Sequence, residues 1–296
     1  MRQVILLVSI IVISVTVSYG QKIATGIKGI STYYALAHDI NIFNEQLTII
    51  ETTGSNENYD TLYQNTNDIC YAFMQSDVYL SNSIKHPLNA VKVVVPLYNE
   101  ELHLIVRNNG SINNLKDLNK DKYKVAIGTK NSGTNTTLKL LIDKLNLKFK
   151  MVEVNYQNGF DQLLDNKIDA LFYIGGAPVQ SFANFPPTIK EIIKLLPIEI
   201  KNDELSKLYF TTTIPKGTYP WVVEEITTIG VKAIIATNIE KTNCDVIILT
   251  TLLLEKLDDF KNTPDFFHSK WQEVDPYTDN YLVPNYCDDV KPLLKK

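Results

Sequence analysis

A short polar turn between a predicted strand and a predicted helix has the residue types needed to bind an anion. Asn131, Ser132, Gly133 and Thr134 follow the apolar run at residues 125–127. Small polar side chains of this kind cap helices, and a glycine lets backbone N–H groups approach a bound group closely. The first turn of a helix has unpaired N–H groups and a partial positive charge, which stabilise an anion by roughly 0.3–1 kcal/mol. The turn therefore indicates half of a small-anion site.

The same turn also has a purely structural interpretation, because Ser, Thr and Gly residues before a helix often do no more than cap it. It is not a nucleotide-binding P-loop, since the Gly-Lys-Ser/Thr ending is missing and Lys130 precedes the glycine. Apolar residues that suit one face of a helix follow at Leu138, Leu141 and Leu145. In either interpretation the turn joins a strand to a helix.

Two other predicted strands end in residues that could contact the same ligand. Gln75 and Ser76 follow one buried apolar run, and Gly175 and Gly176 follow another. Open α/β sheets place ligand contacts at the carboxyl ends of their strands. The structural alternatives stay open, because Ser76 can cap the next helix and a Gly-Gly pair is an ordinary turn.

A second unit of strand, glycine turn and helix lies near the amino end. Residues 23–26 predict a strand that ends in glycine, and Leu36 and Ile40 predict the helix that follows it. Tyr33 and Tyr34 stand at the start of that helix. We expect the two glycine turns to face each other across a cleft and to contact one ligand.

Strands and helices alternate along the chain, which predicts an α/β fold with a mostly parallel sheet and helices on both faces. The chain has 296 residues and 45% hydrophobic content, enough for one large or two ordinary domains. Two separate strand-glycine-helix units indicate two lobes joined by two crossovers. We expect lobe I to comprise residues 21–107 plus 217–296, and lobe II residues 108–216.

Charge and the N-terminal pattern limit the partners and the location. The net charge is −4, and no basic stripe interleaved with aromatic residues occurs, so we expect no nucleic-acid partner. Residues 1–20 combine one arginine, an uncharged apolar run and small residues before Gly20, which predicts a cleaved signal peptide and a periplasmic location. Three cysteines remain, of which Cys70 reads as a buried free thiol, while Cys244 and Cys287 could form a disulfide.

Six short motifs occur in order along most of the chain after residue 20. They are Ile-Ala-Thr-Gly…Thr-Tyr-Tyr (23–34), Gln-Ser-Asp (75–77), Leu-His-Leu-Ile-Val-Arg (102–107), Val-Ala-Ile-Gly…Ser-Gly-Thr (125–134), Ile-Asp-Ala…Gly-Gly-Ala-Pro (168–178) and Ile-Pro-Lys-Gly-Thr-Tyr-Pro (214–220). Together they resemble the TAXI class of solute-binding receptors of TRAP transporters.

The resemblance implies a type II periplasmic-binding-protein fold with two hinge crossovers and the ligand in the cleft between the lobes. It implies a small carboxylate as ligand, such as glutamate, glutamine or a 2-oxoacid, and a TRAP transporter membrane subunit as partner. We expect a monomer without a cofactor or a bound metal. Ser132, Gly133 and Thr134 would bind the ligand carboxylate, and Tyr33, Tyr34 and Gln75 would contact the ligand from the other lobe.

A secreted enzyme on the same two-lobed scaffold is the competing interpretation. The chain contains no Gly-x-Ser-x-Gly, His-Glu-x-x-His or Cys-x-x-Cys motif, and its histidines are scattered. The adjacent pair Glu100-Glu101 is expected to be solvated rather than catalytic. His103 and Arg107 are expected to have structural roles. The sequence therefore favours a binding protein over an enzyme.

Overall fold

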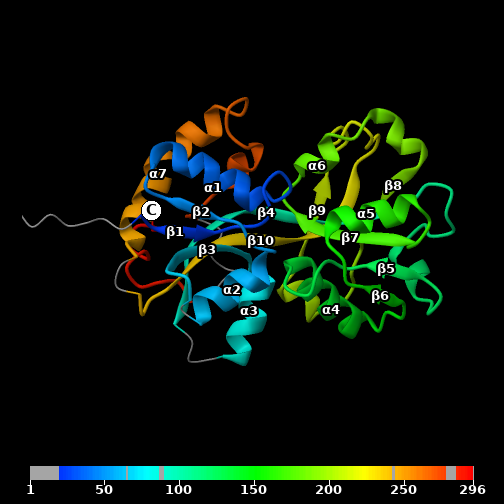
Figure 1. The fold of residues 1–296 in the computed structure, drawn as a ribbon, viewed down its shortest axis with the longest axis horizontal. Helices are drawn as coiled ribbons and strands as arrows, with labels where there is room; N and C mark the ends of the chain where they lie inside the picture. The colour runs from blue at the N-terminus through cyan, green and yellow to red at the C-terminus, as the bar shows by residue number, and fades with distance from the viewer. Residues whose placement is uncertain (1–19, 65, 87–89, 242–243, 278–284, 296) are drawn as a thin grey trace, which may run out of the picture.

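Residues 20–64, 66–86, 90–241, 244–277 and 285–295 are described by a computed structural model, in which helices cover both faces of a mixed sheet (Figure 1). The strands are β1 (Lys22–Ala24), β2 (Thr48–Ile50), β3 (Ile69–Gln75), β4 (Val91–Arg107), β5 (Lys124–Ala126), β6 (Lys150–Val152), β7 (Ala170–Gly175), β8 (Ile193–Leu196), β9 (Phe210–Ile214) and β10 (Ile226–Asn238). The helices are α1 (Thr32–Phe43), α2 (Ser55–Tyr63), α3 (Ser76–Lys85), α4 (Gly133–Leu145), α5 (Tyr156–Leu164), α6 (Gln180–Ala183) and α7 (Val246–Asn262), with 3-10 turns η1 (Leu115–Leu118), η2 (Pro187–Glu191), η3 (Leu205–Lys207) and η4 (Ser269–Glu273).

The sheet runs through both halves of the molecule in the order β2-β1-β3-β10-β4-β7-β5-β6, with β8 paired to β4 and β9 to β10. β1 is parallel to β2 and β3, and β5 is parallel to β6 and β7, whereas β4 and β10 are antiparallel to their neighbours. The predicted α/β fold is therefore confirmed, with parallel strands inside each half and two long antiparallel strands between them.

The two long strands carry the chain from one half to the other. β4 pairs with β10 up to Glu101 and with β7 and β8 beyond it, while β10 pairs with β9 up to Gly230 and with β3 from Ala233. We call the half built on β1–β3, α1–α3 and α7 lobe I, and the half built on β5–β9 and α4–α6 lobe II (Figure 1). The strand partners thus change near Glu101 and Gly230, and the lobe boundaries at 107/108 and 216/217 stay predictions.

The glutamate pair in the middle of β4 is buried, so the expectation that Glu100 and Glu101 are solvated is wrong. Each side chain is 3% exposed. β4 lies in the centre of the sheet, and packed residues cover both of its faces, so two successive side chains pointing to opposite faces are both enclosed. His103 and Arg107 have the expected structural roles, since the Arg107 guanidinium donates to the carbonyl oxygens of Leu163 and Ile168.

The disulfide joins Cys70 to Cys244, so the prediction that Cys70 is a free thiol is wrong, and the alternative left open for Cys244, a bond to Cys287, is not formed. Cys70 lies on β3, and Cys244 precedes α7. The neighbouring Tyr71 hydroxyl donates to the Asp245 carbonyl oxygen at 2.7 Å, which brings the two segments together. Cys287 is a buried free cysteine.

We expect the double variant Cys70→Ala/Cys244→Ala to lose about 2–4 kcal/mol of unfolding free energy, because the bond closes a loop with a sequence separation of 174 residues. Urea denaturation measures this loss, with Cys287→Ala as the matched single-cysteine control. A reductant should lower the stability of the wild type to that of the double variant. A wild type that is equally stable with and without reductant would contradict the prediction.

Helix α7 is amphipathic. Its apolar face buries Leu249, Leu253 and Phe260 against the core of lobe I. None of the described helices is long and apolar enough to cross a membrane. The signal peptide predicted at residues 1–20 falls almost entirely outside the described residues, and it stays a prediction.

Candidate functional site

A cavity of about 250 Å³ lies between the two lobes. Pockets for drug-sized ligands measure roughly 300–1,000 Å³, so this cavity suits a small solute. Lobe I and β4 contribute Gly26, Ile27, Ile30, Ser31, Thr32, Tyr33, Thr53, Gly54, Ser55, Gln75, Tyr98 and Glu100. Lobe II contributes Gly128, Thr129, Ser132, Gly133, Thr134, Val154, Asn155, Tyr156, Leu171, Phe172, Tyr173, Ile174 and Gly175.

Four helices direct their N-termini at this cavity, two from each lobe. The first residues of α1, α2, α4 and α5 all line it. Each helix N-terminus contributes roughly 0.3–1 kcal/mol to the binding of a negative group, through its partial positive charge and its free N–H groups. None of the described residues that line the cavity is a lysine, an arginine or a histidine. Helix ends therefore supply the positive potential of the site.

Ser132 forms the N-cap of α4. Its Oγ accepts a hydrogen bond from the Asn135 amide at 3.2 Å and donates to the Thr129 carbonyl oxygen at 2.8 Å. The Ser132 hydroxyl is thus already used in holding the turn, as the capping interpretation of this sequence requires. The cap fixes the direction in which the next two amides point.

Gly133 and Thr134 follow the cap and have free donors. Within the part of the chain that the structure describes, neither backbone N–H has an acceptor. The Thr134 Oγ1 accepts from the Ile174 amide at 3.2 Å, which leaves its hydroxyl hydrogen available. Two amides and one hydroxyl can therefore donate to an anion at this end of the cavity.

The opposite wall of the cavity is acidic. Glu100 accepts a hydrogen bond from the Tyr33 hydroxyl at 2.5 Å, and the Tyr33 hydroxyl lies 3.1 Å from the Ser55 Oγ. Burial raises the pKa of Glu100 to about 8. The hydroxyl of the fully buried Tyr98, on the same strand, has no hydrogen-bond partner among the described residues. The wall thus combines a carboxyl group and an unpaired hydroxyl.

Hydrogen bonds between the lobes hold the cleft closed around the cavity. Asp77 of lobe I accepts from the hydroxyls of Thr137 at 2.6 Å and Tyr209 at 2.8 Å, both in lobe II. On the other side, the Thr32 hydroxyl donates to the Gly176 carbonyl oxygen at 3.0 Å. A ligand in this cavity would contact both lobes at once.

Residues 23–280, which make up most of this two-lobed unit, match the NMT1-like family. The chain belongs to the NMT1-like family. No curated protein matches this NMT1-like chain.

Solved structures share the fold of this NMT1-like protein. The GluR0 ligand-binding core from Nostoc punctiforme, in complex with L-glutamate, is 15% identical, with 84% of this chain and 99% of that chain covered and a TM-score of 0.52. A cysteine-binding protein from Campylobacter jejuni is 14% identical, with 92% of each chain covered and a TM-score of 0.50. These likenesses confirm the predicted two-lobed, type II periplasmic-binding-protein fold.

The structure brings six of the predicted site residues of this NMT1-like chain to the cavity. They are Tyr33, Gln75, Ser132, Gly133, Thr134 and Gly175. The other four lie outside its lining. The Tyr34 ring faces the Lys28 ammonium, the Ser76 Oγ accepts from the Lys232 amide, the Asn131 carbonyl oxygen accepts from the Glu57 amide, and the Gly176 carbonyl oxygen accepts from Thr32.

Sequence reasoning missed the residues of the acidic wall. Tyr98 and Glu100 form this wall, and Ser55 of lobe I contacts the Tyr33 hydroxyl that donates to Glu100. Glu100 did give a signal, because it interrupts an otherwise apolar segment. Burying a charged side chain costs free energy, so an acidic residue at such a position indicates a function. Ser55 gave no such signal, since a serine at the start of a predicted helix is interpreted as a cap.

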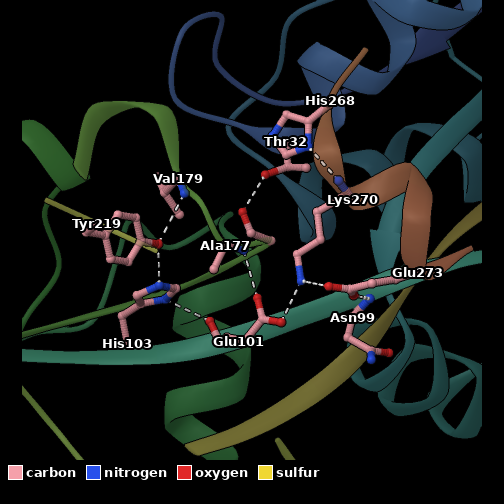
Figure 2. Close-up of polar contacts among 11 residues, drawn as sticks. Thr32, Asn99, Glu101, His103, Ala177, Val179, Tyr219, His268, Lys270 and Glu273 are labelled. Atoms are coloured by element: carbon pink, nitrogen blue, oxygen red, sulfur yellow. Dashed lines mark hydrogen bonds and ion pairs between the residues drawn. The ribbon is translucent and has the colours of Figure 1, made fainter. Parts of the chain in front are cut away.

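A second polar cluster lies beside the site, where β4 crosses between the lobes (Figure 2). The Glu101 carboxylate accepts from the Ala177 amide of lobe II at 2.8 Å and pairs with the Lys270 ammonium at 2.6 Å. Lys270 also pairs with Glu273 at 2.6 Å. Burial raises the pKa of Glu101 to about 7, against the lowering effect of Lys270. We call Glu101, Lys270 and Glu273 the hinge cluster.

His103 extends this network into lobe II as a neutral group. Its Nδ1 faces the Glu101 carbonyl oxygen at 2.9 Å, and its Nε2 lies 2.7 Å from the Tyr219 hydroxyl (Figure 2). A carbonyl can only accept, so Nδ1 carries the proton and Nε2 accepts from Tyr219. Burial lowers the pKa of His103 to about 4. The geometry suits a fixed structural histidine rather than a proton carrier.

Proposed function

We propose that this protein is an extracytoplasmic receptor that binds a small carboxylate in the cleft between its lobes. The observation that carries the proposal is the convergence of four helix N-termini, two from each lobe, on one small cavity. A ligand shifts an equilibrium between open and closed states only by its different affinity for the two states. Contacts from both lobes supply that difference.

The partner we propose is a TRAP transporter membrane subunit, with the receptor in the periplasm. The six motifs that resemble TAXI-class receptors support the partner, and the pattern of residues 1–20 supports the location. The likeness to the glutamate complex of GluR0 and to the cysteine-binding protein supports a small ligand with a carboxylate.

In this function the ligand carboxylate accepts hydrogen bonds from the amides of Gly133 and Thr134 and from the Thr134 hydroxyl. Tyr33 and Gln75 contact the ligand from lobe I. Micromolar binding corresponds to about −8 kcal/mol. Several charge-assisted hydrogen bonds reach this value after the cost of ordering the site is subtracted.

We expect Thr134→Val and Gln75→Ala each to weaken solute binding about 3- to 10-fold, because each removes a polar contact worth roughly 0.5–1.5 kcal/mol. Mass spectrometry of small molecules released from the denatured protein identifies the solute, and calorimetry then measures its affinity. Thr136→Val is the matched control, since Thr136 follows on α4 but does not line the cavity.

Unchanged affinity in both site variants would place the carboxylate site elsewhere. The same calorimetric samples also separate a receptor from an enzyme on this scaffold. A receptor returns the solute chemically unchanged after prolonged incubation, whereas an enzyme converts it.

A further inference from the structure

We propose that the solute is an α-amino acid with an uncharged side chain, whose ammonium group lies against Glu100 and Tyr98 while its carboxylate lies against the first turn of α4. This inference rests on the proposed function and names its substrate class. It excludes 2-oxoacids, which lack the amine, and dicarboxylates such as glutamate.

The first observation is the buried carboxyl group of Glu100 on the cavity wall, which forms no ion pair with a basic side chain of the described residues. It accepts a hydrogen bond from the Tyr33 hydroxyl. Lys270 is engaged with Glu101 and Glu273 at 2.6 Å each. Burying an ionised carboxylate without an opposite charge nearby costs several kcal/mol. A cationic group of the ligand meets this need.

Tyr98 is the second and independent observation. Its hydroxyl is fully buried and has no hydrogen-bond partner among the described residues, although the residue lines the cavity. Buried polar groups are nearly always hydrogen-bonded. The missing partner of the Tyr98 hydroxyl therefore indicates that a ligand in the cavity supplies it. Residues two apart on a strand point to the same face, which puts Tyr98 beside Glu100 on β4. An ammonium has three donors and could serve both.

The acidic wall and the anion end are close enough for one small molecule. The Tyr33 hydroxyl lies 2.5 Å from the Glu100 carboxyl oxygen and 3.1 Å from the Ser55 Oγ. Ser55 is also close to the start of α4, since a Cβ added to Gly133 would lie 2.9 Å from the Ser55 Oγ. The two hydrogen-bond contacts of the Tyr33 hydroxyl and the close approach of Ser55 to Gly133 therefore connect the Glu100 carboxyl to the first turn of α4. An α-amino acid, whose ammonium and carboxylate groups are attached to the same carbon, matches this pair of ends.

The remaining walls favour an uncharged side chain. Apolar residues from both lobes line them, namely Ile27, Ile30, Val154, Leu171 and Phe172. No basic residue occurs among the described lining residues, so a second carboxylate would have no side-chain counter-charge and would be repelled by Glu100. An apolar or amide side chain avoids both costs.

A pH dependence follows from the state of Glu100. Without a ligand, burial raises the pKa of Glu100 to about 8, with further increases from Asp77 and Glu101 and decreases from Tyr33 and Lys270. The tyrosines that face it are Tyr33, Tyr98 and Tyr173. An ammonium requires the ionised carboxylate, so binding below pH 8 releases a proton. We expect the affinity for the amino acid to rise at least tenfold between pH 6.5 and 8.5.

The test is calorimetry at pH 8.0 with matched pairs of compounds. The panel contains the L-amino acids with uncharged side chains, the 2-oxoacids of leucine and phenylalanine, L-glutamate and 2-oxoglutarate. We expect at least one of the uncharged amino acids to bind, and its 2-oxoacid or the charged analogue to bind at least tenfold more weakly. Glu100→Gln should weaken amino-acid binding at least tenfold and abolish the rise with pH. Glu224→Gln, on the exposed surface, is the matched control and should change neither.

The outcomes separate this inference from the proposed function. A 2-oxoacid or dicarboxylate that binds as tightly as the best amino acid overturns the inference, while sensitivity of that binding to Thr134→Val leaves the receptor function intact. An affinity that is unchanged by Glu100→Gln, or independent of pH in the wild type, also overturns it. If no amino acid of the panel binds, the inference is overturned, whereas the receptor function is decided by the solute that mass spectrometry identifies.

Discussion

Gly133→Ala is expected to weaken solute binding about 10- to 100-fold by preventing the lobes from closing fully. A Cβ at Gly133 would lie 1.3 Å from the Gln75 Oε1 and 2.5 Å from its Cδ. Gln75 cannot easily move away, because its Nε2 donates to the Thr137 hydroxyl and its backbone amide donates to the Ser55 Oγ. Overpacking of this kind costs typically 1–3 kcal/mol, and here the cost falls on the closed state alone.

The variant leaves lobe II itself undisturbed. Gly133 is the first residue of α4, and alanine is the better helix former by up to about 1 kcal/mol. Calorimetry measures the lost affinity, and small-angle X-ray scattering with and without solute measures closure as a decrease in the radius of gyration. Thr136→Ala on the same helix is the control. Full affinity together with full closure in Gly133→Ala would contradict the prediction. It would show that Gly133 and Gln75 lie further apart in the ligand-bound state than in this structure.

Short-range patterns in the sequence were sufficient to predict the anion end of the site. The apolar run of β5, the cap at Ser132 and the helical spacing of Leu138 and Leu141 are all local, so they placed Gly133 and Thr134 at a helix start. The alternation of such units also predicted the parallel strands of each lobe. Capping and periodicity act within a few residues, which is why they can be read without the fold.

The acidic wall and the disulfide depend on the sheet order, which local patterns do not contain. Cys70 meets Cys244 because β3 lies beside β10, close to the chain that enters α7. Glu100 is buried because β4 lies in the centre of the sheet and passes the cleft at its middle. Seen locally, a glutamate pair is typical of a solvent-exposed turn, so sequence reasoning assigned it to the surface.

Lys270→Met is expected to lower the free energy of unfolding by about 2 kcal/mol at pH 8.5, because it leaves the Glu101 carboxyl buried without its counter-ion. The side chains of Lys270 and Glu101 are 2% and 4% exposed. Among the residues that the structure describes, the Ala177 amide alone would remain as a donor to the carboxylate. Methionine fills most of the volume of the lysine stem, so the loss reports the charge rather than a cavity.

The sign of the pH dependence distinguishes this mechanism from a packing defect. The pKa of Glu101 is raised from 4.5 to about 7 in the folded protein, so the folded state holds more protons than the unfolded chain between these values, and stability falls as the pH rises. Without Lys270 the pKa of Glu101 rises further, and the fall continues to higher pH. The difference between wild type and Lys270→Met should therefore be small at pH 5.5 and large at pH 8.5.

Urea denaturation at the two pH values measures this difference, with Lys256→Met as the control for an exposed ion pair. Lys256 pairs with Asp259 on α7, and these side chains are 37% and 54% exposed. Its loss should cost less than about 1 kcal/mol at either pH. The double variant Glu101→Gln/Lys270→Met should recover part of the loss at pH 8.5, since it removes the unpaired charge. Equal losses at both pH values, or no recovery in the double variant, would show that Lys270 acts through packing.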